Sequence, residues 1–313
     1  MFYKSIIEKK SASYQLFILL VLFFICLALS SFLFTVMLIP FYGMDVFTNL
    51  QSIANISDPN GIFLLKMMQL ISSVGSFIIP PLLLAHFSSP DVFSYLSIRK
   101  SKKMLPLLIT TILLVILSQP IINFTAEINS HLVLPESMKG VEQWMKEKEA
   151  EAATLTEAFL KVNSVSDLLL NIFIIGLLPA IGEELIFRGV LQKLFIKITT
   201  NIHIGIWITA IVFSAIHFEF YGFLPRMLLG AMFGYLLYWS GSIWITIWAH
   251  FLNNGMGVVM AYLVQRNIVS AEIENAQLPE NEYLWVLASI IIVSALLYWV
   301  YKNKTPAIEQ GPL

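Results

Sequence analysis

The sequence YQLFILLVLFFICLALSSFLFTVMLI, residues Tyr14–Ile39, contains no charged side chain. A transmembrane helix needs roughly 20 consecutive apolar residues, because each residue adds about 1.5 Å and the hydrocarbon core is about 30 Å thick. This run is therefore long enough to cross a bilayer. It is too long for the apolar core of a signal peptide, and no small-residue cleavage site follows it, so we expect a retained span.

Seven further apolar runs follow the first one. They are Ile62–Phe87, Met104–Phe124, Val165–Phe195, Ile204–Phe218, Phe223–Tyr238, Ile243–Val264 and Tyr283–Tyr301. The runs at 204–218 and 223–238 are short and close together, so they are expected to be tilted or partly re-entrant. The pattern predicts an all-α fold, a polytopic transmembrane helix bundle of about eight spans.

Composition supports the lipid bilayer as the environment of much of this chain. Of its 313 residues 58% are hydrophobic and 12% are charged, about half the charged fraction of a soluble domain. Cys26 is the single cysteine, so no internal disulfide can form. The net charge of -1 gives no sign of nucleic-acid binding.

Loop charges predict the orientation of the spans. With the N-terminus in the cytoplasm, the cytoplasmic loops and termini receive eleven Lys and Arg residues against three acids, and the opposite side receives seven against fifteen. Cytoplasmic loops of membrane proteins carry an excess of Lys and Arg. Both termini are therefore expected in the cytoplasm, as an even number of spans requires.

The chain divides into three expected regions. Residues 1–164 hold about three spans and a charged extramembrane segment, residues 165–264 form a core of four spans, and residues 265–313 hold a loop, the last span and a cytoplasmic tail. The extramembrane segment, residues 125–164, is rich in helix formers of mixed charge. It predicts a solvated or interfacial helix, which is either a spacer or a lid or substrate-docking element.

Ionisable groups inside a membrane cost roughly 2.5–3.5 kcal/mol each, and the first cluster of them lies in the 165–195 run. Glu184 and Arg188 are spaced i, i+4, the favourable order for a structural ion pair. Glu183 points elsewhere and has no partner on its own helix. A buried, unpaired carboxylate suits general-base chemistry. Pro179 frees a backbone carbonyl nearby.

Two further runs carry histidines. His217, alone on an apolar segment, has the ordinary interpretation of a hydrogen-bonded core residue. His250 and Asn254 share one helix face and could simply bridge helices. Taken together with Glu183, however, two imidazoles and a carboxamide on three separate segments are the groups needed to activate a water molecule and to stabilise an oxyanion.

These motifs carry a resemblance to a known family. Glu-Glu-x-x-x-Arg, Phe-x-x-x-His and His-x-x-x-Asn, in this order over roughly Leu168–Val264, resemble the CPBP (CAAX protease and bacteriocin-processing, or Abi) family of intramembrane endopeptidases. The resemblance implies that Glu183 is the general base acting on water and that His217 helps to position that water. It implies that His250 and Asn254 hold the oxyanion. The residues given supporting roles are Glu184 and Arg188, as an ion pair, and Phe213, in the pocket wall.

Three points stay open at this stage. Asn253 adjoins Asn254, so a shift of one residue would exchange their roles, and Glu219 is expected to be solvated. Counted along ideal helices, Glu183 lies about 24 Å below the outer edge of its span and His217 about 20 Å above the inner edge of its own, which predicts different depths.

The cofactor also stays open. Glu183, His217 and His250 are all residue types that bind zinc, but no His-Glu-x-x-His motif is present. The family has been described both as metalloproteases and as metal-independent glutamate proteases. The sequence is therefore compatible with a divalent metal such as zinc and with none.

The preferred hypothesis is an endopeptidase of the bacterial plasma (inner) membrane that cuts membrane-associated protein or peptide substrates. One alternative is a non-catalytic scaffold or bacteriocin-immunity protein, which would not need an unpaired glutamate in lipid. A transporter or channel is the other, although the sequence shows no interrupted helices in two matching halves.

Overall fold

The computed structural model describes residues 6–270 and 282–304, which form helices and connecting turns without a β-strand. Six helices of these residues are long and apolar enough to cross a membrane, and a pair bent by 40°, Met104–Leu117 and Gln119–Ser130, would make a seventh. The six are Ala12–Leu50, Pro59–Ser88, Val165–Thr199, Phe220–Ser240, Ile243–Gln265 and Tyr283–Lys302. An eighth apolar helix, Ile202–Ala215, is shorter. The predicted all-α polytopic bundle is confirmed.

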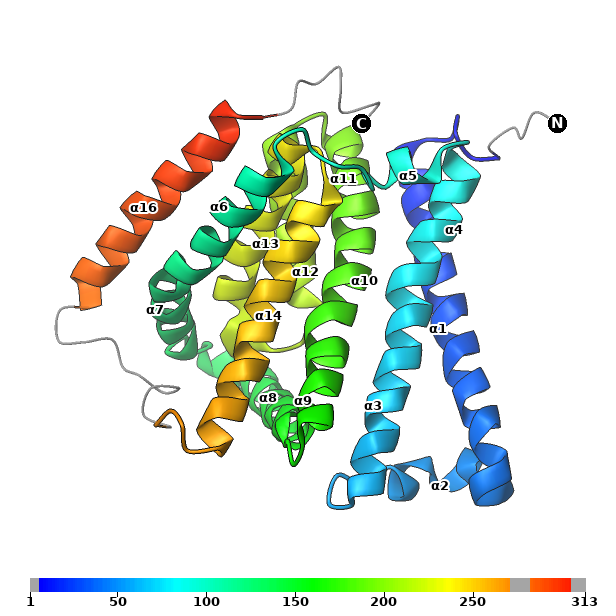
Figure 1. Cartoon of the computed structure of the whole chain (residues 1–313). Coiled ribbons are helices and arrows are strands. Elements are labelled where there is room, and N and C mark those ends of the chain that lie inside the picture. The colour runs from blue at the N-terminus through cyan, green and yellow to red at the C-terminus, as the bar shows by residue number, and fades with distance from the viewer. Residues whose placement is uncertain (1–5, 271–281, 305–313) are drawn as a thin grey trace.

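The first two spans form a hairpin beside the rest of the bundle (Figure 1). Its first arm is α1 (Ala12–Tyr42) and its second arm runs through α3 (Pro59–Ser73), the π-helix η2 (Val74–Ile78) and α4 (Ile79–Ser88). A short helix, α2 (Val46–Ile53), lies between the arms. The second arm packs against α10, the helix that carries Glu183.

The central rod of the bundle is the 35-residue segment Val165–Thr199. It comprises α9 (Val165–Asn171), η4 (Ile172–Leu177), α10 (Leu178–Ile186), η5 (Phe187–Leu191) and α11 (Gln192–Thr199). Both η4 and η5 are π-helical, a geometry that is rare and frequent at functional sites. At about 1.5 Å per residue the rod is roughly 52 Å long, so it extends well beyond the hydrocarbon core of a membrane.

Three helices pack in sequence against this rod. They are α12 (Ile202–Ala215), α13 (Phe223–Ser240), which the 3₁₀ turn η6 (Phe220–Gly222) precedes, and α14 (Ile243–Gln265). Thr200, in the left-handed conformation at φ 52°, allows the tight turn from α11 into α12. Gly241, at φ 65°, does the same between α13 and α14.

The predicted difference in depth between Glu183 and His217 is wrong. The two residues lie on antiparallel neighbours joined by the turn at Thr200, so depth is properly counted from that turn. Glu183 is 16 residues from Thr199 and His217 is 15 residues from Ile202, or about 24 Å and about 22 Å at 1.5 Å per residue. The error came from assuming that the long rod fits within one bilayer thickness.

The remaining helices enclose α13 and α14. The bent pair α6 (Met104–Leu117) and α7 (Gln119–Ser130) packs on them, and α16 (Glu282–Lys302) covers α6 and α7. The start of α1 and the end of α16 lie at the same end of the bundle (Figure 1), as an even number of spans requires. Which end faces the cytoplasm stays a prediction from the loop charges.

The charged segment before the rod forms the expected helix, α8 (Lys139–Leu160), at the opposite end of the bundle (Figure 1). A buried lysine fixes its C-terminal end: Lys66 Nζ donates to Asn171 Oδ1 at 2.7 Å, and Asn171 Nδ2 donates to the Phe159 carbonyl at 2.7 Å. The Trp144 ring packs against the rings of Phe218 and Phe220. α8 therefore lies against the turn that follows His217.

We expect Gly205→Ala to destabilise the fold. A Cβ atom at Gly205 would lie 2.7 Å from the backbone nitrogen of Ile196 and 2.8 Å from its Cα, so α11 and α12 would have to separate. Overpacking of this kind costs about 1–3 kcal/mol and should lower the thermal unfolding midpoint in detergent. Gly257→Ala is the control, because nothing lies within 4 Å of an added Cβ there. An equal midpoint for the two variants would contradict this close packing.

Candidate active site

Glu183 and two imidazoles from other helices come together inside the bundle. The Glu183 Oε2 atom lies 3.7 Å from His250 Nε2, on α14, and 3.9 Å from His217 Nε2, just beyond the end of α12. Oε2 is buried and has no hydrogen-bond partner among the residues that the structure describes. The exposed fractions of the side chains are 26% for His217, 15% for Glu183 and 5% for His250. His217 is therefore on the side from which water reaches the carboxylate.

A second carboxylate, that of Glu184, contacts His250 and Arg188 on the buried side of the site. Its Oε1 atom accepts from Arg188 Nη1 at 2.9 Å and lies 2.9 Å from His250 Nδ1. Arg188 Nη2 donates to the Gly230 carbonyl on α13 at 2.9 Å. Both charged side chains are fully buried. This network links α10, η5, α13 and α14 at one level.

The Nδ1 partners select the tautomer that each imidazole adopts when it is neutral. His217 Nδ1 lies 2.7 Å from the Phe213 carbonyl oxygen, which can only accept, and the Glu184 carboxylate near His250 Nδ1 likewise only accepts. Each neutral ring must therefore carry its hydrogen on Nδ1 and present an unprotonated Nε2. Three acceptor atoms, Glu183 Oε2 and the two Nε2 atoms, face one another with no donor between them. The arrangement suits a molecule that donates hydrogens, such as water.

Aromatic rings pack around these polar groups. The Phe213 ring meets His217 and His250 edge-on, with ring centroids 5.1 Å and 5.9 Å away. Phe233 stacks on His250 at 5.4 Å, and the Arg188 guanidinium lies 4.6 Å from the centre of the Phe213 ring. Since rings fill the space beside the imidazoles, their orientation is restricted and the surroundings are of low polarity.

Asn254 reaches the backbone of the central rod. Its Nδ2 atom donates to the Ile175 carbonyl at 3.4 Å. Ile175 lies four residues before Pro179, whose missing N–H leaves a helical carbonyl available, as the sequence indicated. Asn253 donates to Asn254 Oδ1 at 3.3 Å. The helix register therefore places Asn254, and not Asn253, against η4.

The turn between α12 and α13 forms the edge of the site. Glu219 was expected to be solvated, but the structure pairs it with Arg226, which also donates to the Glu219 backbone carbonyl. The Glu219 side chain is 34% exposed. The turn is further held by Asn129 of α7, which donates to the Phe220 carbonyl at 2.6 Å and accepts from the Leu224 N–H at 3.1 Å. His217 is thus carried by a turn that is fixed on both sides.

The three candidate metal ligands do not fit a bound zinc ion as they are placed. Within residues 6–270 and 282–304, no group of three His, Cys, Asp or Glu side chains is arranged to hold a metal ion. We therefore assign chemical steps to the side chains alone.

The motifs did not point to the groups that support the site from α13. Phe233, the Gly230 carbonyl and Arg226 all come from this helix. The sequence held one signal, the four-residue spacing of Gly230 and Gly234, which favours close packing of helices. A Cβ atom on Gly230 would lie 3.2 Å from the Phe213 ring, so the glycine lets α13 approach the site.

We expect Arg188→Leu to destabilise the protein strongly, because it leaves the fully buried Glu184 carboxylate without a cation. Breaking a buried pair in this way costs about 3–5 kcal/mol. The double variant Glu184→Gln/Arg188→Leu should recover much of the lost stability, since no buried charge is left. The control is Arg226→Leu, whose partly exposed pair contributes about 0–1 kcal/mol. Thermal unfolding in detergent measures all three, and equal midpoints would contradict the importance of the buried pair.

Comparisons with known proteins bear on the same region. Residues 165–256 match the family described as type II CAAX prenyl endopeptidase Rce1-like. The uncharacterized protein YpbD of Bacillus subtilis (strain 168) is 31% identical over 86 residues, which are 26% of this chain and 41% of that protein. The match thus spans less than half of the relative. No solved structure matches. Residues 165–256 of this chain are therefore similar to the Rce1-like family of type II CAAX prenyl endopeptidases.

Proposed function

We propose that this protein is an intramembrane endopeptidase that hydrolyses peptide bonds of membrane-associated protein or peptide substrates. One observation carries the proposal: the partnerless Glu183 Oε2 atom lies within 4 Å of the Nε2 atoms of His217 and His250. An unpaired carboxylate at this depth is costly. Residues 165–256 match a family of endopeptidases, and hydrolysis would give that cost a chemical reason.

In the first step Glu183 acts as the general base. A water molecule among the three acceptors donates one hydrogen to Glu183 Oε2 and the other to His217 Nε2. As its oxygen attacks the substrate carbonyl carbon, the proton shared with Glu183 passes to the carboxylate, and the carbonyl π electrons move to the carbonyl oxygen. His217 holds the water in place because its Nδ1–H is fixed by the Phe213 carbonyl.

The oxyanion formed in this step needs hydrogen-bond donors. Asn254 can supply one by turning its Nδ2–H away from the Ile175 carbonyl, to which its bond is long at 3.4 Å. His250 can supply a second only when its Nε2 is also protonated, because its other hydrogen points at Glu184. The Glu184 carboxylate stabilises that imidazolium, so we assign Glu184 and Arg188 the role of positioning and charging His250.

In the last step the intermediate collapses. The proton held by Glu183 passes to the amide nitrogen, the carbon–nitrogen bond breaks, and the products are a carboxylic acid and an amine. Glu183 is again a carboxylate. The cycle consumes one water molecule and needs no other reactant, which agrees with a site that is open to water at His217 and closed behind Glu184.

The family description suggests which substrates to test first. Its members are named for prenylated CAAX proteins, so a quenched fluorescent peptide containing an S-farnesyl cysteine, and the same peptide without farnesyl, are suitable reporters. We place the protein in the bacterial plasma membrane with both termini in the cytoplasm. A scaffold or immunity protein remains an alternative, and would keep its phenotype in a Glu183→Gln variant.

Glu183→Ala and His217→Ala are both expected to abolish cleavage of the reporter that the unmodified protein cuts. The first variant removes the base, and the second removes the acceptor that holds the water. General-base catalysis is typically worth about 10²–10⁴ in rate, so residual activity should be at least a hundredfold lower. Initial rates in proteoliposomes measure the effect.

The control for this pair is Glu136→Gln, which changes an exposed carboxylate that contacts Lys139 instead of the site. It should retain most of the rate. All variants should show the same circular dichroism and elution in detergent as the unmodified protein. Cleavage that survives Glu183→Ala would remove the proposed mechanism.

Chelation should leave the rate unchanged, because Glu183, His217 and His250 are not arranged to hold a metal ion. The measurement is reporter cleavage after dialysis against 1,10-phenanthroline, with and without added zinc. A rate that falls on chelation and returns with zinc would contradict this expectation, and would make the three side chains metal ligands.

A further inference from the structure

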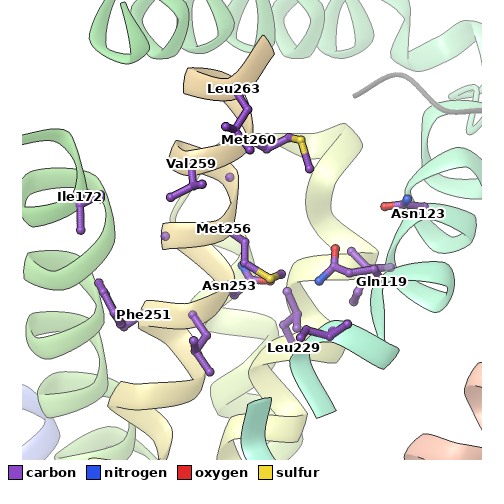
Figure 2. Close-up of a pocket in the computed structure, with 15 residues that line it drawn as sticks. Gln119, Asn123, Ile172, Leu229, Phe251, Asn253, Met256, Val259, Met260 and Leu263 are labelled. Atoms are coloured by element: carbon purple, nitrogen blue, oxygen red, sulfur yellow. The ribbon is translucent and has the colours of Figure 1, made fainter. Parts of the chain in front are cut away.

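A lateral groove of about 860 Å³ lies between α14, α7, α13 and η4, within the range of about 300–1,000 Å³ typical of ligand sites. None of the residues that line it is charged, and its surface is mainly apolar. Three carboxamides interrupt this surface. Gln119 and Asn123 project from α7 toward α14, where Asn253 lies opposite Gln119 (Figure 2).

The groove arises from a proline bend. Pro120 cannot donate a helical hydrogen bond, and the axis turns by 40° between α6 and α7. Above the bend α6 packs on α14, whereas below it α7 packs on α13 and η6 instead. The Leu117 carbonyl at the bend accepts from Ser289 of α16 at 2.5 Å. The separation of α7 from α14 therefore follows from Pro120, and the hydrogen bond from α16 stabilises the bend.

The carboxamides identify the class of occupant. Each carries donors and an acceptor, the same pair of groups that a peptide backbone presents. Asn123 is exposed and has no hydrogen-bond partner among the described residues, and Gln119 donates across the bend to the Val115 carbonyl of α6. An acyl chain could not pair with these groups, and burying an unpaired amide costs about 1–3 kcal/mol. An uncharged polypeptide matches both the apolar wall and the amides.

α14 contributes residues both to the groove and to the candidate active site. Asn253 belongs to the groove lining and donates to Asn254, the predicted oxyanion ligand. Phe251, another lining residue, packs near Gly176 of η4. A chain held beside Asn253 therefore lies one residue along α14 from the side chain assigned to catalysis.

We propose that this groove binds an extended, uncharged segment of the substrate polypeptide, with Gln119, Asn123 and Asn253 pairing with its backbone amides. The proposal rests on the proposed function and specifies how that enzyme selects its substrate. Backbone pairing explains why the groove needs amides instead of charges. Side-chain selection then comes from its apolar wall, which excludes charged residues from the bound segment.

The test measures binding without catalysis. Glu183→Gln protein in detergent is titrated against a fluorescein-labelled, end-blocked peptide of leucine, alanine and serine, and anisotropy gives Kd. The Gln119→Leu/Asn123→Leu double variant should bind about fivefold more weakly for each lost carboxamide, as expected for hydrogen bonds of about 1 kcal/mol. Gln69→Leu is the control, because Gln69 likewise donates to a residue four positions away, Ser73, but lies outside the groove.

A second probe isolates the backbone contacts. The same peptide with N-methylated amides lacks backbone donors, so it should bind to the Glu183→Gln protein more weakly than the parent peptide does. Its Kd for the double leucine variant should equal its Kd for the Glu183→Gln protein. Equal or tighter binding of the parent peptide by the leucine variant would overturn the proposal in favour of an acyl chain. Undetectable binding by the Glu183→Gln protein would also overturn it. Failure of the proposed function would appear separately, as cleavage that survives Glu183→Ala.

Discussion

The Glu184 carboxylate is the contact on which the site depends. One oxygen, Oε1, receives both Arg188 and His250, so a single buried acid fixes the position of a cation and the neutral tautomer of an imidazole. If Glu184 were neutral, Arg188 would be an unpaired charge in a fully buried position. If His250 lost this acceptor, its neutral ring would no longer be held with its hydrogen on Nδ1, the atom that points away from Glu183. The adjacent acid, Glu183, can remain unpaired because its neighbour satisfies the other charged groups.

A second constraint is geometric, and it concerns the turn at Thr200. Because α11 and α12 are antiparallel and joined by two residues, positions equally far from the turn meet at the same level. Glu183 lies 16 residues before Thr199 and His217 lies 15 residues after Ile202, so their distances from the turn are almost equal. α12 ends at Ala215, and the turn that follows it places His217 within 4 Å of the Glu183 carboxylate.

Several of these features could be predicted from the sequence. Apolar run length gave the helical bundle, and the i, i+4 spacing of Glu184 and Arg188 gave their contact, because both depend only on local periodicity. The meeting of Glu183 with His217 and His250 could be expected only from motif resemblance. Helix depth could not be predicted, since the length of the rod beyond the membrane depends on its packing with α3, α8 and α14. The contacts of Phe233 and Arg226 likewise depend on which face α13 presents.

Two prolines shape the surroundings of α14, one at the site and one at the groove. Pro179 leaves the Ile175 carbonyl available for Asn254, and Pro120 turns α7 away from α14. α14 lies between the two consequences: His250 and Asn254 contact the central rod, while Asn253 lines the groove. Asn253 and Asn254 differ by one position, so they project about 100° apart from one helix. A rigid α14 would couple them, because any rotation that moved Asn253 toward the groove would also change the distance from His250 to Glu183. In the proposed enzyme, substrate binding and water activation would therefore both depend on the position of α14.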